Sequence, residues 1–254
     1  MPISASEILK RTVTTPDPAN SNQLHDVFAL PAGRTLDICL NIQSAILEHK
    51  LAPGLKLSED EVGEIYGASR TVVRAALQAL AHSGLISIRK NRGAFVAKPS
   101  IREAHEVFQA RALIEPAVAR LAAEVITETQ LANLKAHLEA EHVAIHSADM
   151  GHALMLSGSF HTAIADIADH RVFSGMVRSL ISRSSLIIAL YWKRSDTACE
   201  SHSHNALLRA FEKRDGGEAE KIQKSHIIDL YSGLDLRDQT PETVTLSQAL
   251  GQKT

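Results

Sequence analysis

The chain has 254 residues, of which 44 % are hydrophobic and 22 % are charged, and its formal net charge is −2. This length and hydrophobic content suffice for a sizeable core and predict two domains. A near-neutral charge excludes a protein that coats nucleic acid through its overall charge, so DNA affinity would have to come from a local patch.

The N-terminal part of the chain changes character near residue 35. Residues 1–34 carry four prolines among Ser, Thr and Asn, which predicts a flexible arm. From residue 36 to 47 the apolar side chains follow a helical spacing, and the Pro53-Gly54 turn comes after that helix. The first folded domain is therefore predicted to begin at residue 35.

A winged helix-turn-helix is predicted over residues 35–98. Residues 58–67 and 70–84 each read as a short helix, and the tight turn Gly67-Ala68-Ser69 separates them. In residues 85–98 the side-chain types alternate along the chain, a pattern that fits a β-hairpin. Helix, turn, helix and hairpin in this order place the second helix in the major groove of DNA.

This predicted domain contains a local basic block. Six Lys or Arg residues and no acidic residue occur from Arg70 to Lys98. Arg70 and Arg74 are four residues apart and share one helical face, and Ser69 can cap the helix whose N-terminus favours phosphate. Gly93, at the tip of the hairpin, lets the backbone approach the duplex. The predicted DNA-binding residues are Ser69, Arg70, Thr71, Arg74, Lys90, Arg92 and Gly93.

Beyond Pro99-Ser100 the chain reads almost entirely as amphipathic helix. The predicted helices span 101–125, 128–148, 151–169, 171–191, 203–214 and 218–233. Helices of this length with short connections predict an antiparallel all-α bundle over residues 101–237. The polar residues 238–254 are predicted to form a frayed tail. The fold class is therefore mainly α, a winged domain followed by a helical bundle.

The segment from Leu36 to Val96 resembles the winged helix-turn-helix of the GntR family of bacterial transcription regulators. Four short motifs and a longer one carry the resemblance, at 51–54, 57–59, 67–77, 84–86 and 91–96. Together they span about 60 residues in order. One position departs from the pattern: Asp60 stands where related regulators often have an arginine that contacts DNA, so the first helix is expected to contribute less.

The second half resembles the effector domain of the FadR subfamily of these regulators. The resemblance rests on residues 106–116, 159–164 and 204–227. It implies a bundle that binds a divalent metal, with zinc as the expected ion, through His161, His204 and His226, beside a cavity for small carboxylates. Ser157 stands where the family has an aspartate ligand, so water or effector oxygen would complete the site. The alternative is three buried histidines in a cavity without metal.

Spacing gives independent support for two of these histidines. His204 lies eleven residues before Asp215, and His226 lies eleven residues after it. If two antiparallel helices meet at a break in Gly216-Gly217, both imidazoles lie roughly 16 Å from the turn, at about 1.5 Å per residue. They can then converge on one ion with His161.

An anionic effector would also need a cationic partner in the cavity. Arg111 and Arg183 are the candidates, because arginine binds carboxylate in a bidentate manner. Each of them can equally be a structural ion-pair partner, and Glu115 lies four residues after Arg111. The predicted effector-binding residues are Arg111, Ser157 and Arg183.

Taken together, the sequence predicts a ligand-responsive transcription regulator that binds operator DNA as a homodimer and has no enzymatic activity. A dimer is expected because two-fold operators are matched by two-fold proteins. The chain lacks the common catalytic motifs, but a metal-dependent enzyme or a metal sensor with a DNA-binding appendage is the alternative.

A cytoplasmic location is predicted for the protein. The N-terminus lacks a signal-peptide pattern, and no run of about 18 apolar residues predicts a membrane span. Cys39 and Cys199 lie outside any metal or redox motif and are read as free thiols in a reducing compartment.

Overall fold

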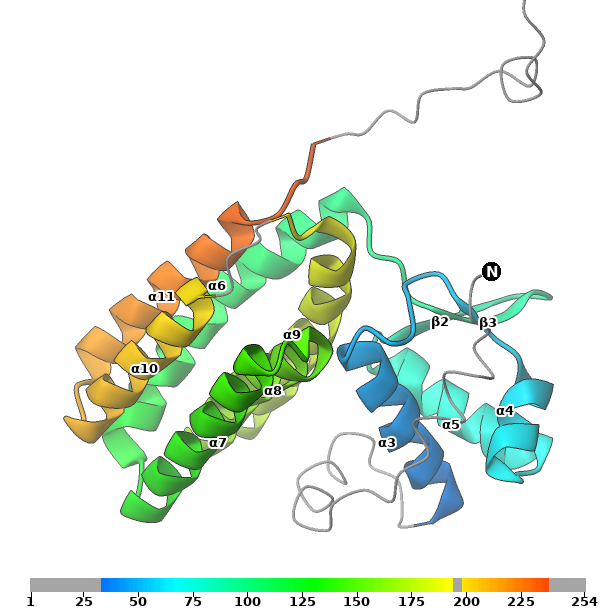
Figure 1. Ribbon diagram of the computed structural model, residues 1–254, viewed down its shortest axis with the longest axis horizontal. Helices are drawn as coiled ribbons and strands as arrows, with labels where there is room; N and C mark the ends of the chain where they lie inside the picture. The colour runs from blue at the N-terminus through cyan, green and yellow to red at the C-terminus, as the bar shows by residue number, and fades with distance from the viewer. Residues whose placement is uncertain (1–32, 194–197, 238–254) are drawn as a thin grey trace, which may run out of the picture.

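The computed structural model describes residues 33–193 and 198–237. The predicted tail and all but the last two residues of the predicted arm lie outside the described residues. Two parts of the molecule stand side by side in Figure 1, a small domain with a three-stranded sheet and a larger bundle of long helices. The predicted fold class, mainly α with a winged domain before a helical domain, is confirmed.

Among the described residues, the small domain contains three helices and a small antiparallel sheet. Its elements are α3 (Arg34–Leu47), β1 (Lys56–Leu57), α4 (Glu59–Tyr66), α5 (Arg70–His82), β2 (Ile86–Arg89) and β3 (Gly93–Val96). The strand order is β1-β3-β2, and Arg89 pairs with Gly93 at the end of the hairpin. The two-residue β1 was not predicted. Asn91 and Gly93 both have positive φ at the tip, a conformation that glycine adopts without strain.

The apolar periodicity of α5 explains how this helix packs against the rest of the winged domain. Val73, Ala76, Leu77 and Leu80 are buried on one face of the helix, where they pack with residues of α3 and the hairpin. The opposite face of α5 stays exposed and presents Arg70 and Arg74. The amphipathic pattern of this segment therefore fixes which side of the helix is free to meet a partner.

The larger domain is built from six helices within the described residues. They are α6 (Ile101–Val125), α7 (Glu128–His146), α8 (Met150–Ile167), α9 (Arg171–Tyr191), α10 (Ala198–Glu212) and α11 (Gly216–Ser232). By length and composition α9 is long and apolar enough to cross a membrane, but it packs against α6 and α8 of the bundle. An apolar core formed by helices α6 to α11 fills the interior.

The turn between α10 and α11 differs from the prediction. Gly216 and Gly217 do not form the break between the two helices, because α11 begins at Gly216. The turn lies just before it, with Arg214 in the left-handed region at a φ of 52°. The Asp215 side chain accepts a hydrogen bond from the Glu218 N–H and caps the new helix. An N-cap carboxylate, rather than the glycines, therefore sets this boundary.

The two domains pack directly on one another. Leu186 of α9 belongs to the buried core of the winged domain. His49, just after α3, lies with Nε2 3.1 Å from the Ser185 carbonyl oxygen. Gly151 at the start of α8 lies so close to the Glu48 carbonyl that no Cβ would fit there. The end of α3 is thus seated against α8 and α9.

Candidate functional site

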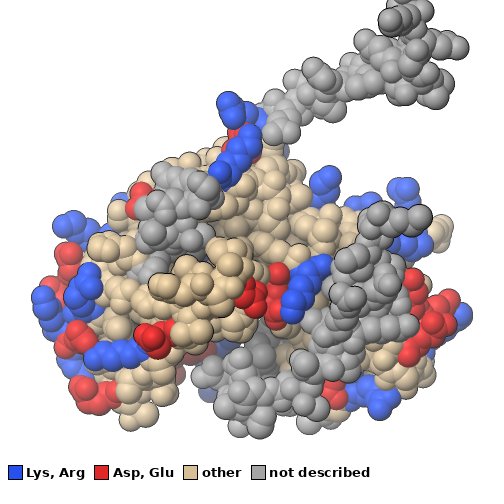
Figure 2. All heavy atoms as spheres, viewed as in Figure 1, with Lys and Arg blue, Asp and Glu red and all other residues tan. Residues whose placement is uncertain are grey.

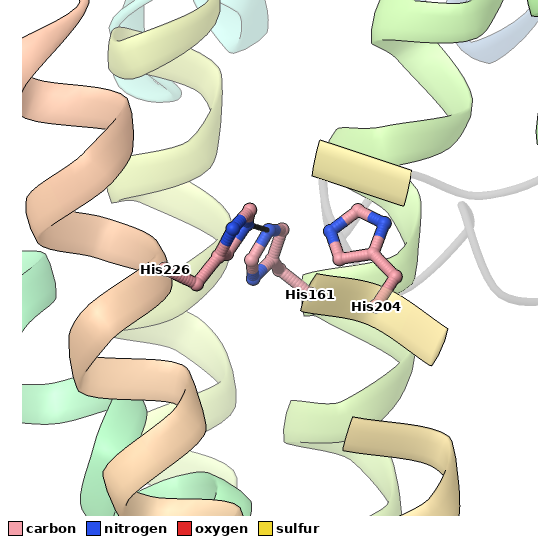
Figure 3. A group of neighbouring side chains, drawn as sticks. All are labelled: His161, His204 and His226. Atoms are coloured by element: carbon pink, nitrogen blue, oxygen red, sulfur yellow. Dashed lines mark hydrogen bonds between the residues drawn. The ribbon is translucent and has the colours of Figure 1, made fainter. Parts of the chain in front are cut away.

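Three histidines from three helices meet in the interior of the bundle (Figure 3). His161 lies on α8, His204 on α10 and His226 on α11, and all three side chains are buried. Their ring centroids are 4.9 to 5.3 Å apart. One nitrogen of each ring lies within 4.8 Å of the other two. The structure therefore brings together the three residues that the sequence singled out.

Glu115 of α6 fixes the orientation of the His161 ring. Its Oε2 lies 3.0 Å from His161 Nδ1 and accepts a hydrogen bond from Gln223 Nε2 at 2.8 Å. Burial raises the pKa of Glu115, but the charge of Arg111 and the hydrogen bonds from His161 and Arg111 outweigh burial and leave it at about 2. An ionised carboxylate only accepts, so a proton on His161 Nδ1 would be donated to Glu115 and would leave a lone pair on Nε2. The Gln223 Nε2 atom also lies 3.0 Å from His161 Nδ1.

Glu141 of α7 orients His204 in the same way. Its Oε2 lies 3.0 Å from His204 Nδ1, and both side chains are buried. On the other side of the ring, His204 Nε2 is buried and has no hydrogen-bond partner among the described residues. Sequence reasoning missed Glu141, because a glutamate on an amphipathic helix gives no local sign of a partner 63 residues away.

The donor set fits a divalent metal ion. Nε2 of His161 and Nε2 of His226 are 3.3 Å apart. Two nitrogens bound to one tetrahedral zinc lie roughly 3.3 Å apart, given a Zn–N bond of about 2.05 Å. Burial lowers the pKa of both rings, so at neutral pH both are uncharged, as metal ligands must be. The orphaned Nε2 of His204 is the third donor that an ion would satisfy.

A cavity of about 90 Å³ borders His161, one of the three histidines. Space of this size holds several waters or a small organic molecule. His161 and Ser157 of α8 and Arg111 of α6 line it, together with hydroxyl groups of α9. Ser157 is buried one turn before His161, so the position of the expected acidic ligand faces the cavity.

Of the two candidate arginines, only Arg111 lines the cavity. Arg111 lines the cavity and is almost fully buried, but its guanidinium is paired with Glu115 at 2.5 Å and donates to Ser184 Oγ. Arg183 does not line this cavity. It pairs with Glu103 at 3.1 Å and lies beside Gly84 of the winged domain. Arg178, which the sequence analysis did not name, lines the cavity and pairs with Asp166.

The predicted DNA-binding residues occupy two exposed places on the winged domain. Ser69, Arg70, Thr71 and Arg74 lie at the start of α5 and are exposed. Lys90, Arg92 and Gly93 are exposed at the tip of the hairpin, and Figure 2 shows basic side chains at the upper right of the molecule, above a cluster of acidic ones. Both places can face a duplex, one as a helix in the major groove and one as a wing.

Acidic residues of α4 pair with the arginines of α5. Arg70 Nε lies 2.9 Å from Asp60, and Arg74 makes two hydrogen bonds to Glu59. The hydrogen bond and charge of Arg74 hold the pKa of Glu59 below its usual value. The Ser69 side chain makes no capping hydrogen bond, contrary to the role expected for it. Phosphate would therefore have to displace carboxylates from both arginines.

Comparisons with known proteins match both halves of the chain. Residues 35–96 match the bacterial regulatory proteins of the gntR family, and residues 106–229 match the FCD domain. The chain is 33 % identical over 178 residues to the HTH-type transcriptional repressor RspR of Escherichia coli K12, which covers 70 % of this chain and 78 % of RspR. It is 24 % identical over 216 residues to the galactonate operon transcriptional repressor of the same organism, covering 74 % and 91 %.

Two solved structures have a similar fold. Escherichia coli McbR/YncC superimposes with a TM-score of 0.69 at 22 % identity, over 80 % of this chain and 99 % of that one. A GntR transcriptional regulator from Rhodococcus sp. RHA1 has a TM-score of 0.66 at 21 % identity, over 79 % and 97 %. The shared architecture is a winged domain joined to a helical domain.

Proposed function

This chain belongs to the GntR family of bacterial transcription regulators, and we propose that it couples operator binding to a small carboxylate and a divalent metal held in its FCD domain. The observation that supports the coupling most directly is the convergence of His161, His204 and His226, of which His161 lines a cavity that reaches the winged domain. Regulation then requires that the ligand change the affinity for DNA.

Zinc is the proposed metal. Zinc sites with three protein ligands and an open fourth position are held by neutral imidazoles whose other nitrogen is fixed by a carboxylate. Glu115 and Glu141 supply that support for His161 and His204. When bound, the ion would offer its open position to an oxygen ligand, and Ser157 leaves that position without a competing carboxylate.

The proposed effector is a small carboxylate, bound beside the histidines. Arg111 and Arg178 give the cavity its positive charge, although each already has a carboxylate partner. One relative is named for the galactonate operon, and galactonate is a polyhydroxylated acid of this class. We propose binding and not catalysis at this site, since the two carboxylates nearest the histidines are engaged as acceptors of ring N–H groups.

We propose that the protein acts in the cytoplasm as a homodimer. An exposed groove runs between α6 and α9, and its lining includes the apolar side chains of Ile114, Val172 and Met176. Leu113, 79 % exposed, lies next to it on α6. Exposed apolar side chains gathered along one groove favour a contact with another chain. A two-fold contact here would present two winged domains to a two-fold operator.

Arg70→Ala and Arg74→Ala should each weaken operator binding about 5- to 150-fold, since a lost base contact raises the binding free energy and every tenfold step is 1.4 kcal/mol. Binding is measured by fluorescence anisotropy on a duplex that the full chain selects from random DNA. If the arginine holds phosphate instead of a base, the slope of log affinity against log salt falls by about one.

The control for this pair is Arg102→Ala on α6. The Arg102 side chain is 88 % exposed, against 75 % for Arg70 and 61 % for Arg74, and like them it pairs with a carboxylate, but it lies in the bundle. Its removal should leave operator affinity unchanged. Wild-type affinity in folded Arg70→Ala and Arg74→Ala variants would contradict the assignment of α5 to the groove.

Titration of operator binding with zinc, with a chelator and with organic acids tests the coupling. A carboxylate that binds the zinc-loaded protein should change operator affinity by about 5- to 150-fold, and operator DNA should change the acid affinity by the same factor. A response to zinc without any acid would identify a metal sensor. Turnover of the acid during the titration would instead identify an enzyme.

A further inference from the structure

The cavity beside the histidines lies at the joint between the two domains. Its lining includes Gln43 and Leu47 of α3 and His49 just beyond it, opposite residues of α8 and α9. The same region of α3 is fixed to the bundle through the contact of His49 with the Ser185 carbonyl. One wall of the cavity thus belongs to the domain that carries the DNA-reading helix.

Gln43 has an unusual position on that wall. The side chain is 7 % exposed, and its Oε1 has no hydrogen-bond partner among the described residues. A buried acceptor without a partner is destabilising, and an apolar residue of similar shape would avoid the loss. The terminal amide turns about a soft torsion, so it can be presented to the cavity at small cost. An acceptor of this kind fits a donor group on a ligand.

The other polar groups of the cavity indicate which ligand chemistry suits it. Hydroxyl groups of α8 and α9 line it at Ser159, Thr162, Ser182, Ser184 and Ser185. The apolar part of the lining consists of leucine, isoleucine and methionine side chains. Hydroxyl groups both donate and accept, so they can bind several hydroxyls of one small molecule. Gln43 Oε1 would accept a hydrogen bond from a ligand O–H.

We propose that the effector is a hydroxylated carboxylate clamped between the two domains, with Gln43 of the winged domain as a residue that selects it. The inference rests on the proposed function, because it requires an acid in this cavity. Its consequence is direct coupling: a ligand touched by both domains favours the domain arrangement in which both sets of contacts form. Effector selection and the orientation of α5 are then set by the same contacts.

The test compares Gln43→Met with the matched variant Gln109→Met, at an exposed glutamine of α6. Zinc-loaded full-length proteins are titrated calorimetrically with D-galactonate, lactate and citrate. Wild type and Gln109→Met should bind at least one hydroxylated acid equally well. Gln43→Met should bind it at least about tenfold more weakly, as expected for loss of a specific hydrogen bond. Without acid, its melting temperature should equal or exceed that of wild type.

Leu47→Trp provides a second variant on the same wall. The larger side chain fills the cavity from the α3 side and should also weaken acid binding by tenfold or more. If Gln43→Met does not fold, this variant still tests whether the α3 wall of the cavity contacts the acid.

The possible results separate the two proposals. Equal acid affinity in wild type and Gln43→Met, or in wild type and Leu47→Trp, overturns the clamp and leaves the acid effector in place. A clear loss of melting temperature in acid-free Gln43→Met shows that Gln43 has a structural partner and also overturns the clamp. If none of the three acids binds wild type, the result contradicts both the proposed acid effector and its binding between the two domains.

Discussion

Replacing His226 by asparagine should lower zinc affinity by more than about 100-fold, since even residues that only support a ligand change metal affinity by about 10- to 100-fold. Asparagine keeps much of the volume of the ring but removes Nε2, the atom that lies 3.3 Å from His161 Nε2. Zinc content is measured by elemental analysis of protein purified without a histidine tag. Affinity is measured by competition with a chromophoric chelator.

Two further variants make this result specific. His146→Ala removes an exposed histidine at the end of α7 and should leave zinc binding unchanged. Glu141→Gln should give an intermediate loss of about 10- to 100-fold, because it weakens the acceptor for His204 Nδ1 and leaves all three ligands in place. If His226→Asn binds zinc with wild-type affinity, the metal site lies elsewhere in the protein. If wild type contains no zinc, the three histidines form a buried polar cluster without a metal.

Arg111→Ala should destabilise the bundle by about 3–5 kcal/mol, because it leaves the buried Glu115 carboxylate without its cationic partner. The guanidinium and the carboxylate are 2 % and 3 % exposed. A cost of this size is a large part of the stability of an ordinary domain. Urea unfolding followed by circular dichroism measures it, and zinc binding should weaken in parallel, since Glu115 also orients His161.

The same helix supplies the control for this ion pair. Arg102 and Glu106 have the same four-residue spacing on α6, but the Arg102 side chain is 88 % exposed. Water and salt screen an exposed pair, so Arg102→Ala should hardly change the unfolding midpoint. Similar losses for both variants would mean that the helix, and not the burial of the pair, determines the effect.

Local sequence patterns predicted most of the helices. The amphipathic periodicity of residues 101–125 and 171–191 gave the limits of α6 and α9 as the structure has them. The predicted element boundaries were wrong where a local pattern fitted two different structures. Gly216-Gly217 was read as a helix break, but Asp215 caps a helix that starts there. The short strand β1 was missed, because two residues carry no period of their own and exist as a strand only through pairing with β3.

The sequence by itself determined the winged domain, the basic block of α5 and the hairpin, and the pairing of His204 with His226. Each of these depends on spacing within one segment or on an equal distance from a single turn, whereas His161 was predicted only from the family resemblance. His204 and His226 do approach one another, with ring centroids 4.9 Å apart, because a hairpin of two helices constrains their heights.

Only the tertiary structure decided which residues support the histidines and which line the cavity. Glu141 reaches His204 across 63 residues, and Gln43 comes to the cavity from the other domain. Arg178 lines the cavity and Arg183 does not, although both lie on α9. Five residues along a helix turn a side chain by roughly 140°, so the choice between them depends on how α9 is rotated against its neighbours. That rotation is set by packing between distant segments, which no local pattern records.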